Sequence, residues 1–233
     1  MVAIRDSVAL VTGGQRGLGR AFADALLERG AEKVYVTARK PAPAHDPRIR
    51  PVPLDVTDPD AVSALAAQAR DVDIVFNNAG VLYPSPLLTA DMADVVATFE
   101  TNVFGALRVA QGFAPILAAN GGGALVDMHS VLSWAVGAGA YGASKAALWS
   151  MTNALRVELA PQGTQVVGVH LGLADTDMVA EFPAAKISPA EVAEAVLDGI
   201  ENGATEVLVD AVSRQIKAAL SGPVEGLTLP IGR

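Results

Sequence analysis

The stretch that decides the fold runs from Val8 to Gly19 and reads VALVTGGQRGLG. Its first four residues are an apolar run typical of a buried strand, and the residues after the glycines, Ala21 to Leu27, have a helical pattern closed by Gly30. In a strand, turn and helix of this order, glycines let the backbone approach a pyrophosphate and aim the helix N-terminus at it. The stretch therefore predicts a dinucleotide site, with a purely structural tight turn as the alternative.

The glycine spacing narrows the kind of site. The pattern Gly-x3-Gly-x-Gly differs from the Gly-x-Gly-x-x-Gly of the commonest dinucleotide fingerprint. It is not a P-loop either, because no Gly-Lys-Ser/Thr follows. The spacing is compatible with a dinucleotide but does not by itself identify one.

Outward from this stretch, apolar runs alternate with helical segments along the whole chain. The expected strands are 8–11, 33–38, 50–54, 73–76, 124–126, 165–171 and 206–210. The expected helices are 21–27, the segment after Pro59, 91–117, 140–159 and 188–200. This alternation is typical of a parallel α/β fold. We expect a single doubly wound Rossmann domain over residues 1–233, with a largely parallel seven-stranded sheet, helices on both faces and a Pro/Gly-rich tail.

Composition excludes several classes of protein. Hydrophobic residues make up 51% of the chain and charged residues 18%, so a large core is expected. A net charge of −8 argues against nucleic acid and an anionic membrane surface, and no apolar run approaches the ~20 residues of a membrane span. The lack of cysteine excludes disulfides and thiolate metal sites. We expect a cytoplasmic protein without a metal, in which His45, His129 and His170 have structural roles.

The end of the second strand bears on the choice of cofactor. An NAD site usually has an acidic residue there to bind the ribose 2′-hydroxyl. Here the chain has Ala38, Arg39 and Lys40, and Arg16 lies in the glycine turn. Because arginine grips phosphate in a forked way, the pattern favours the 2′-phosphate of NADP over NAD. Two ordinary surface arginines are the alternative.

A second group of chemically active residues lies between Ser130 and Lys145. On the expected helix 140–159, Tyr141 and Lys145 are four residues apart and share one face. A phenol has a pKa of about 10, and a neighbouring ammonium lowers it, so this tyrosine can exchange a proton with a carbonyl or alcohol oxygen. Ser130 follows the fifth strand, where its hydroxyl can hold the same oxygen. A surface Tyr-x3-Lys pair is the alternative.

Asn102 lies inside the long expected helix 91–117. Asparagine has a weak helix propensity and competes for backbone hydrogen bonds. We interpret Asn102 as a kink or a polar relay, with a solvated helix face as the alternative.

Four features in this order resemble the short-chain dehydrogenase/reductase family. They are Thr12-Gly-x3-Gly-x-Gly19 after the first strand, Asn77-Asn78-Ala79-Gly80 after the fourth, Ser130 after the fifth, and Tyr141-x3-Lys145 on the following helix. The resemblance covers essentially the whole chain. It implies an NADP(H)-dependent oxidoreductase that transfers a hydride between the nicotinamide and an aldehyde or ketone, or the corresponding alcohol.

The resemblance also implies roles for individual residues. Tyr141 is the expected general acid/base, and Lys145 lowers its pKa and binds the nicotinamide ribose. Ser130 holds the substrate oxygen, and Asn102 anchors a water-linked proton relay. The other expected cofactor contacts are Gly13, Arg16, Gly17, Leu18 and Gly19 on the pyrophosphate and adenosine side, Ala38 and Arg39 in the NADP-preferring pattern, Asp55 and Val56 at the adenine, Asn77, Ala79 and Gly80 along the cofactor, and Thr176 at the carboxamide.

Three departures from the family pattern carry expectations of their own. Leu171-Gly172 stands where many members have Pro-Gly, so the local backbone need not follow the family. The spacing from Ser130 to Tyr141 is shorter than usual, which makes Ser133 a fallback for holding the substrate oxygen. The segment 178–188, where the family has its substrate lid, is short and suggests an open pocket.

The expected pocket lining is mostly apolar and comprises Leu82, Tyr83, Val131, Leu132, Trp134, Val136, Val179 and Phe182. It favours a small hydrophobic carbonyl or alcohol as substrate. Small residues and an apolar stripe follow Tyr141, and the family pairs this helix and the Asn102 helix across two-fold axes, so we expect a homodimer or homotetramer. The alternatives are a non-catalytic dinucleotide-binding sensor or scaffold, whose members usually lack Tyr or Lys, and a dehydratase or epimerase with a longer C-terminal region.

Overall fold

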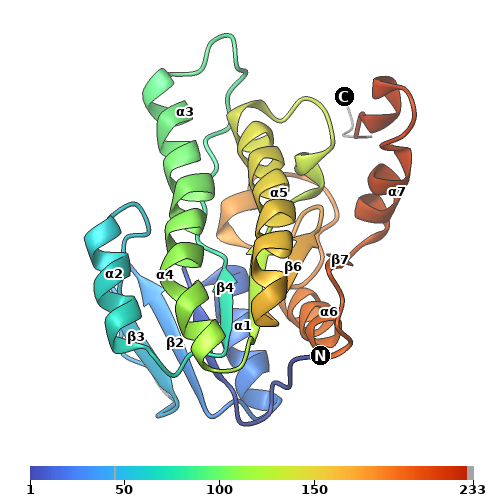
Figure 1. Cartoon of the computed structure of the whole chain (residues 1–233). Coiled ribbons are helices and arrows are strands. Elements are labelled where there is room, and N and C mark those ends of the chain that lie inside the picture. Colours follow the sequence, from blue (N-terminus) through green and yellow to red (C-terminus); the bar gives the residue numbers. More distant parts are fainter. Residues whose placement is uncertain (45, 230–233) are drawn as a thin grey trace.

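Seven parallel strands form one sheet in the order β3-β2-β1-β4-β5-β6-β7 (Figure 1). The computed structural model describes residues 1–44 and 46–229, so the expectation for His45 lies outside the described residues. The strands are β1 (Val8–Val11), β2 (Lys33–Ala38), β3 (Ile49–Pro53), β4 (Ile74–Asn77), β5 (Ala124–Met128), β6 (Gln165–His170) and β7 (Glu206–Leu208). The helices are α1 (Gly17–Glu28), α2 (Pro59–Gln68), α3 (Met92–Phe99), α4 (Ala106–Ala119), α5 (Gly139–Leu159), α6 (Pro189–Glu201) and α7 (Ala211–Ala219). The predicted doubly wound fold is confirmed.

Alternating residues of each strand pack against two layers of helices. In β1, Ala9 and Val11 belong to the hydrophobic core shared with α1 and α6, whereas Val8 and Leu10 belong to the core shared with α2 and α4. This follows from the period of two in a strand, which sends neighbouring side chains to opposite faces. Figure 1 shows α2, α4 and α5 in front of the sheet. Within the described ranges, no helix is long and apolar enough to cross a membrane.

The order of the strands places the crevice of the sheet. The chain starts at β1, winds outward to β3, and then returns to the other side of β1 with β4. Ligands of open α/β sheets bind outside the carboxyl ends of the strands at such a switch point. The glycine turn follows β1 and Asn77 ends β4, so the fold brings two motifs that are distant in sequence to one crevice.

The expected helix 91–117 consists of three segments. Between α3 and α4, residues Glu100–Gly105 form a π-helical turn that contains Asn102. Such turns are rare in proteins as a whole. Those that do occur frequently lie at functional sites. Gly105 also passes so close to the loop after β3 that a Cβ there would lie 2.7 Å from Val56 Cγ2. The kink that we expected at Asn102 is therefore a local change of helix type.

The tail contains a helix where the Pro/Gly-rich sequence predicts none. The carboxylate of Asp210 accepts hydrogen bonds from Ser213 N at 2.8 Å and from Ser213 Oγ at 2.6 Å, and thereby caps α7. Because Asp210 begins this helix, β7 ends at Leu208 and not at Asp210 as expected. Ile216 of α7 is buried in a small hydrophobic cluster with Trp134, close after Ser130.

Candidate active site

The glycine turn between β1 and α1 has a backbone geometry that side chains do not fit. Gly13 and Gly17 have φ values of +64° and +52°, in the left-handed region. A Cβ on Gly19 would lie 2.3 Å from the Gly13 carbonyl oxygen. Leu18 is partly buried between these glycines. The turn thus brings bare backbone to the carboxyl end of β1.

The N-terminus of α1 has no side-chain cap. Arg16 precedes the helix and makes no capping hydrogen bond, and no acidic residue lies in the first turn. By contrast, Asp58 caps α2 and Ser188 caps α6. The first amides of a helix need partners, and the helix dipole favours an anion there. This end of α1 therefore fits the pyrophosphate of a dinucleotide.

Two polar side chains tie the glycine turn to the loop after β4. The Thr12 hydroxyl donates to Phe76 O at 3.1 Å and accepts from Asn78 N and Ala79 N, each at 3.0 Å. Asn78 Nδ2 donates to Thr12 O at 2.8 Å and lies 3.3 Å from Gly13 O. Our expected contacts omit Thr12 and Asn78, although both stand inside the quoted motifs. Together they fix the two walls of the crevice.

The residues after β4 point in different directions. Asn77 is buried, and its amide donates to Asp127 Oδ1 at 2.9 Å and to the backbone of α4, so this side chain belongs to the sheet interior. Gly80 lies at the crevice instead. A Cβ on Gly80 would be 3.3 Å from Asn102 Oδ1 and 3.9 Å from Lys145 Nζ.

The residues expected at the adenosine end lie at the carboxyl ends of β2 and β3. Ala38 ends β2 and is partly buried, and Arg39 beside it is exposed. Hydrogen bonds from the backbone and the hydroxyl of Thr57 lower the pKa of Asp55, and the nearby charge of Arg39 adds to this effect. Val56 is buried next to Asp55.

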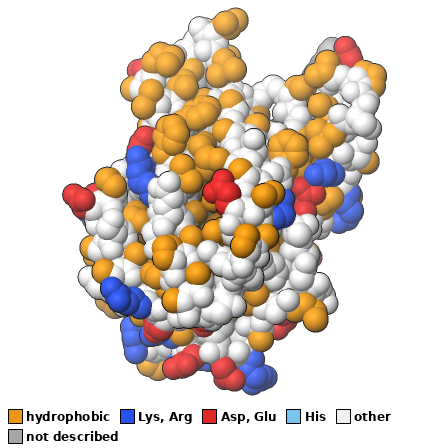
Figure 2. Space-filling view, in the orientation of Figure 1, with side chains coloured by type: hydrophobic (Ala, Val, Ile, Leu, Met, Phe, Trp, Pro, Cys, Tyr) orange, Lys and Arg blue, Asp and Glu red, His pale blue; other side chains and the backbone are white. Residues whose placement is uncertain are grey.

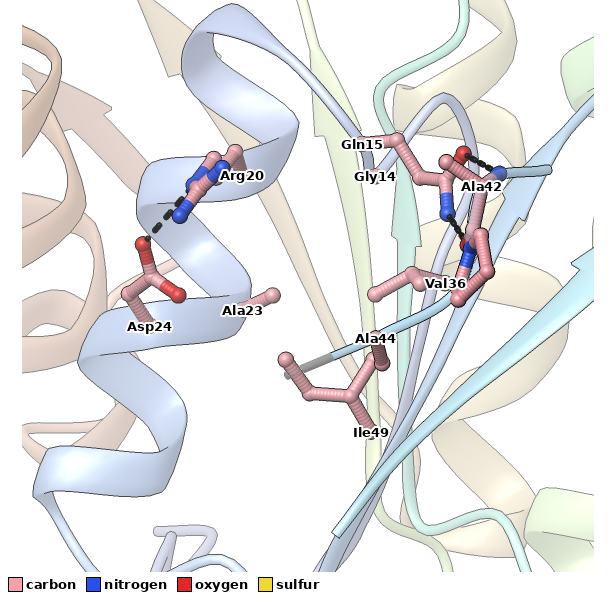
Figure 3. A pocket seen from close by; sticks show the side chains of 10 residues that line it. Gly14, Gln15, Arg20, Ala23, Asp24, Val36, Ala42, Ala44 and Ile49 are labelled. Atoms are coloured by element: carbon pink, nitrogen blue, oxygen red, sulfur yellow. Dashed lines mark hydrogen bonds and ion pairs between the residues drawn. The ribbon is translucent and has the colours of Figure 1, made fainter. Parts of the chain in front are cut away.

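Gln15 of the glycine turn holds the loop after β2 (Figure 3). Its amide donates to Ala42 O at 2.7 Å and accepts from Ala42 N at 2.8 Å. The pair borders a cavity of about 110 Å³ between α1 and this loop. Arg16, the next residue, is exposed and lies 3.9 Å from Asp177. Arg16 and Arg39 are thus two exposed cations, Arg16 in the glycine turn and Arg39 directly after β2.

Ser130 follows β5 and caps a short 3₁₀ helix, Val131–Ser133. Its Oγ accepts from Leu132 N at 3.1 Å, and Ser133 Oγ accepts from Ser130 N at 3.4 Å. The Ser130 side chain also lies close enough to the Tyr141 phenol to lower its pKa. The short spacing therefore leaves Ser130 beside Tyr141, and Ser133 supports Ser130 from behind.

Tyr141 and Lys145 lie on one face of α5, with Lys145 Nζ 5.7 Å from the centre of the Tyr141 ring. The ammonium donates to Met128 O at 2.7 Å. Burial lowers the pKa of Lys145 to about 8, and a negative charge on Asp127 would oppose this fall. Burial raises the pKa of Tyr141 to about 12, and the nearby Ser130 side chain opposes this rise. The expected lowering of the Tyr141 pKa by Lys145 does not occur in this arrangement, because the ammonium is directed to the Met128 carbonyl.

Asn102 joins the π-helical turn to the loop after β4 and to α5. Its Oδ1 accepts from Val81 N at 2.8 Å, and its Nδ2 donates to Val81 O at 3.0 Å and to Ser144 Oγ at 3.1 Å. Ser144 Oγ in turn donates to Tyr141 O at 2.7 Å. Asn102 is only 1% exposed, so the alternative of a solvated helix face is wrong.

Thr176 lies opposite the glycine turn. A Cβ on Gly17 would be 3.1 Å from Thr176 Cγ2, so the two residues face each other across the crevice. The expected lid segment begins with a short 3₁₀ helix, Asp177–Val179. Met178 and Phe182 in this segment are exposed hydrophobic side chains.

The Leu171-Gly172 turn after β6 is fixed without the family's proline. Leu171 O accepts from Val131 N at 2.8 Å, and Gly172 N donates to Asp210 Oδ2 at 2.6 Å. The turn is thereby tied to the residue after Ser130 on one side and to the start of α7 on the other.

His129 and His170 are far apart in sequence but form a buried pair, with His129 Nδ1 2.9 Å from His170 Nε2. Burial lowers the pKa of His170 to about 3 and that of His129 well below its usual value. Both are therefore neutral at neutral pH. No sequence signal places them together, because neither lies in a recognisable motif. In the part of the chain that the structure describes, no group of three or more His, Cys, Asp or Glu residues is arranged to hold a metal ion.

Known proteins share this sequence and architecture. The family model described as short chain dehydrogenase matches residues 7–187. An uncharacterised oxidoreductase of Staphylococcus aureus (strain USA300) is 31% identical over 212 residues, which cover 84% of this chain and 92% of the relative. A short-chain dehydrogenase of Penicillium ochrochloron is 37% identical over 182 residues, 72% of this chain and 65% of the relative. The crystal structure of a short chain dehydrogenase from Burkholderia cenocepacia J2315 in complex with NADP is 39% identical, covers 96% of each chain and has a TM-score of 0.91.

These matches define the class of protein. The chain belongs to the short-chain dehydrogenase/reductase family, as the four motifs predict, and it is an oxidoreductase. The family binds a nicotinamide dinucleotide, and the bare glycine turn and the uncapped start of α1 fit such a group.

Proposed function

We propose that this protein is an NADP(H)-dependent carbonyl reductase, or an alcohol dehydrogenase in the reverse direction. The observation that carries the proposal is the meeting of three side chains. Ser130 lies close enough to the Tyr141 phenol to lower its pKa, and Lys145 Nζ lies 5.7 Å from the Tyr141 ring. A hydroxyl, a phenol and an ammonium at one crevice suit proton transfer to a carbonyl oxygen.

Each of these residues has a distinct part in the proposed reaction. The nicotinamide, when bound, supplies or receives the hydride. Tyr141 gives its proton to the carbonyl oxygen, and a pKa of about 12 keeps the phenol in the protonated form that reduction needs. Ser130 holds the same oxygen with its hydroxyl. Lys145 places positive charge near the phenol and binds the ribose, and Asn102 anchors the proton relay.

The proposed cofactor is NADP(H), with NAD(H) as the less favoured alternative. Ala38 presents no carboxylate to repel a phosphate, and the exposed Arg16 and Arg39 can pair with one. The NADP bound to the Burkholderia cenocepacia relative supports this choice. Gly13, Gly17, Leu18 and Gly19 would carry the pyrophosphate and adenosine side, with Asp55 and Val56 at the adenine, Ala79 and Gly80 along the cofactor and Thr176 at the carboxamide.

A small hydrophobic aldehyde or ketone, or its alcohol, is the proposed substrate. Several of the expected lining residues present apolar surface, with Tyr83, Val136 and Phe182 all exposed. Two others do not. Val131 and Trp134 are buried in the cluster with α7, so they are support and not lining.

The test is a screen of NADPH oxidation over a panel of aldehydes and ketones, repeated with Tyr141→Phe. This variant loses only the phenol hydroxyl, so it should bind NADPH normally while turnover falls by ~10²–10⁴-fold. Lys145→Ala should weaken both NADPH binding and turnover. Near-normal turnover in Tyr141→Phe would show that another group is the acid. A protein that binds NADPH but reduces no carbonyl of the panel would favour the non-catalytic sensor.

A homodimer or homotetramer in the cytoplasm is part of the same proposal. Figure 2 shows hydrophobic side chains gathered over α3, α4 and α5, where Val96, Phe104 and Val157 are 59%, 46% and 75% exposed. Large exposed apolar patches mark association surfaces. Light scattering at micromolar concentration should give a mass of two or four chains, and a monomer at that concentration would contradict this part of the proposal.

A further inference from the structure

A chain of buried polar side chains runs behind Ser130. His170 Nδ1 lies 3.2 Å from Ser130 O, and His170 Nε2 lies 2.9 Å from His129 Nδ1. His129 Nε2 lies 2.8 Å from Thr152 Oγ1, which lies 2.7 Å from Asp127 Oδ2. Thr152, His170 and Asp127 are each 0% exposed. The chain thus links three secondary-structure elements, β5, β6 and α5, to the backbone of Ser130.

The atoms at the Ser130 end fix where each proton lies. A backbone carbonyl only accepts, so His170 must donate to Ser130 O from Nδ1. Burial keeps His170 neutral, so its Nε2 carries no proton and must accept, and the neighbouring donor is His129 Nδ1–H. His129 is neutral for the same reason, so its Nε2 accepts in turn. In this order the single hydroxyl proton of Thr152 goes to His129 Nε2 and not to Leu148 O, which lies 2.8 Å from Thr152 Oγ1.

The same counting determines the state of Asp127. The Thr152 proton is used toward His129, so the contact of 2.7 Å between Thr152 Oγ1 and Asp127 Oδ2 needs a proton from the carboxyl group. Oδ1 of the same group accepts from Asn77 Nδ2 at 2.9 Å. In this order of protons Asp127 is a neutral carboxylic acid, against the nearby charges of Lys145 and Arg156, which favour its carboxylate. Burial also raises its pKa, in agreement with this assignment.

The outer side of His170 is held by aromatic stacking and by a cation. The Trp134 ring stacks on His170 at 3.7 Å between ring centres, and Lys217 of α7 lies 4.7 Å from the centre of the Trp134 ring. Lys217 also pairs with Glu206 at 2.8 Å, the carboxylate nearest to His170, whose Oε1 lies 3.6 Å from His170 Nε2. The pairing with Lys217 reduces the tendency of Glu206 to draw a second proton onto His170.

We propose that His170 is a positioning residue for Ser130, and that Asp127, Thr152 and His129 hold it in the Nδ1–H tautomer that makes this possible. The proposal rests on the proposed function, in which Ser130 holds the substrate oxygen. Ser130 O receives the His170 proton while Ser130 Oγ meets Tyr141, so the imidazole sets the depth of the serine in the crevice. A misplacement of about 1 Å at a reacting group can cost ~10²-fold in rate.

The proton order is measured directly by the ¹⁵N chemical shifts of the ring nitrogens in the unmodified protein. The chain has three histidines, so His45→Gln identifies the His45 signal, and His170→Asn then separates the signals of His129 and His170. We expect the Nδ1–H tautomer at both His129 and His170 at pH 7. An Nε2–H tautomer or a doubly protonated ring at His170 would overturn the proposal. The measurement needs neither substrate nor cofactor, so its failure is distinct from that of the proposed function.

Two substitutions at His170 separate positioning from packing. An Asn amide nitrogen occupies nearly the place of Nδ1 and still donates to Ser130 O, whereas a Gln amide nitrogen lies near the place of Nε2. With the substrate found in the screen, His170→Asn should keep kcat within about threefold, and His170→Gln should lose ~10-fold or more. KM for NADPH should stay unchanged in both. Equal losses in the two variants at equal melting temperature would show a packing role only.

Asp127 provides the second test, with a control on the same side of the sheet. In Asp127→Asn the amide can donate to Thr152 and accept from Asn77 as the neutral acid does, so kcat and both tautomers should persist. Asp127→Ala should lower kcat by ~10-fold or more, as His170→Gln does. The matched control is Thr164→Val. Thr164 precedes β6, and its buried hydroxyl donates to Gly122 O at 2.7 Å, away from the histidines in the fold. This substitution should leave kcat unchanged. If Asp127→Asn is as damaging as Asp127→Ala, the group is a carboxylate and the assigned proton order is wrong.

Discussion

The two sides of the crevice differ in what forms them: mainly backbone on one side and buried side chains on the other. On the cofactor side, the walls are mainly backbone: a glycine turn and an uncapped helix start, tied to the loop after β4 by the side chains of Thr12 and Asn78, with the cations Arg16 and Arg39 exposed at the rim. On the Ser130 side, the support is made of buried side chains. His170 and Asp127 are 0% exposed there.

This difference predicts how each side responds to change. Exposed charges are screened by salt and solvated by water, so their substitution alters selectivity at little cost to the fold. Buried polar groups depend on their partners, and the loss of one partner leaves another unsatisfied. Cofactor choice is therefore expected to be adjustable, whereas the Ser130 support is expected to tolerate only isosteric changes.

The largest expected effect tests the exposed side. Each arginine–phosphate contact is worth roughly 1.5–3 kcal/mol when partly exposed. Because 1.4 kcal/mol is about tenfold in affinity, two contacts predict a preference for NADPH over NADH of about two orders of magnitude. The double substitution Ala38→Asp with Arg39→Leu should reverse the preference, since the new carboxylate accepts from the ribose hydroxyls and repels the phosphate. The measurement is the ratio of kcat/KM with the two cofactors.

Salt provides the control for this prediction. Raising the ionic strength should reduce the NADPH preference of the unmodified protein, because exposed charges are screened within about 10 Å at 0.1 M salt. The same rise in ionic strength should not reduce an NADPH preference in the double variant, because that variant is expected to prefer NADH. Equal efficiencies with NADPH and NADH in the unmodified protein would show that Arg16 and Arg39 are ordinary surface charges.

The next effect tests the buried side through pH. His129 and His170 stay neutral in the folded state down to low pH, whereas in the unfolded state they bind protons below about pH 6.5. The unfolded state therefore gains protons, and stability falls, as the pH drops below 6.5. Asp127, whose folded pKa is raised, acts in the opposite direction. With two histidines against one carboxyl, we expect a net loss on the order of 1 kcal/mol in unfolding free energy between pH 6.5 and 5.

Urea unfolding at several pH values, without cofactor, measures this loss. His170→Asn removes one of the two histidines, so its stability should fall less steeply over the same range. Arg39→Leu, on the exposed side, should follow the pH dependence of the unmodified protein. A His170→Asn variant that lost stability as steeply as the unmodified protein would mean that His170 is already protonated when folded.

The fold was predictable because its signals are local. The apolar run before the glycine turn defines β1, and alternation of strands and helices defines the doubly wound order. The helix α7 was not predictable from the Pro/Gly-rich tail, since its stability comes from the Asp210 cap and from Ile216 packing beside Trp134. These are contacts between segments that composition does not reveal.

The site was predictable to the extent that motifs carry it. Ser130, Tyr141 and Lys145 lie in one motif order, and the structure brings them together. The direction of a side chain was not predictable from the motifs. Asn77 and Asn78 are neighbours, but the Asn77 side chain donates to Asp127 and the Asn78 side chain donates to the glycine turn. The pKa of Tyr141 also depends on burial, which no spacing gives. The His129–His170 pair depends on the register of β5 and β6, which the sequence does not state.

The smallest expected effect concerns Gln15, a side chain that supports the loop after β2 on the exposed side. Gln15 holds Ala42 through two hydrogen bonds, at 2.7 and 2.8 Å, and Ala42 lies in the loop that starts with Arg39 (Figure 3). Gln15→Ala removes both bonds and should loosen this loop. Each net hydrogen bond contributes about 0.5 kcal/mol in an exposed setting, so the loss of two, about 1 kcal/mol together, should raise KM for NADPH about fivefold. KM for NADH and kcat should stay unchanged, because neither depends on Arg39.

The neighbouring pair Arg20 and Asp24 supplies the control. It faces the same cavity in Figure 3, but its contact of 3.4 Å joins two residues of α1 and leaves the loop free. Asp24→Asn should therefore leave both KM values unchanged. If Gln15→Ala raises KM for NADH as much as KM for NADPH, the hydrogen bonds to Ala42 support the glycine turn itself. The exposed side would then depend on side-chain support as the Ser130 side does, and the contrast between the two sides would be smaller than the structure indicates.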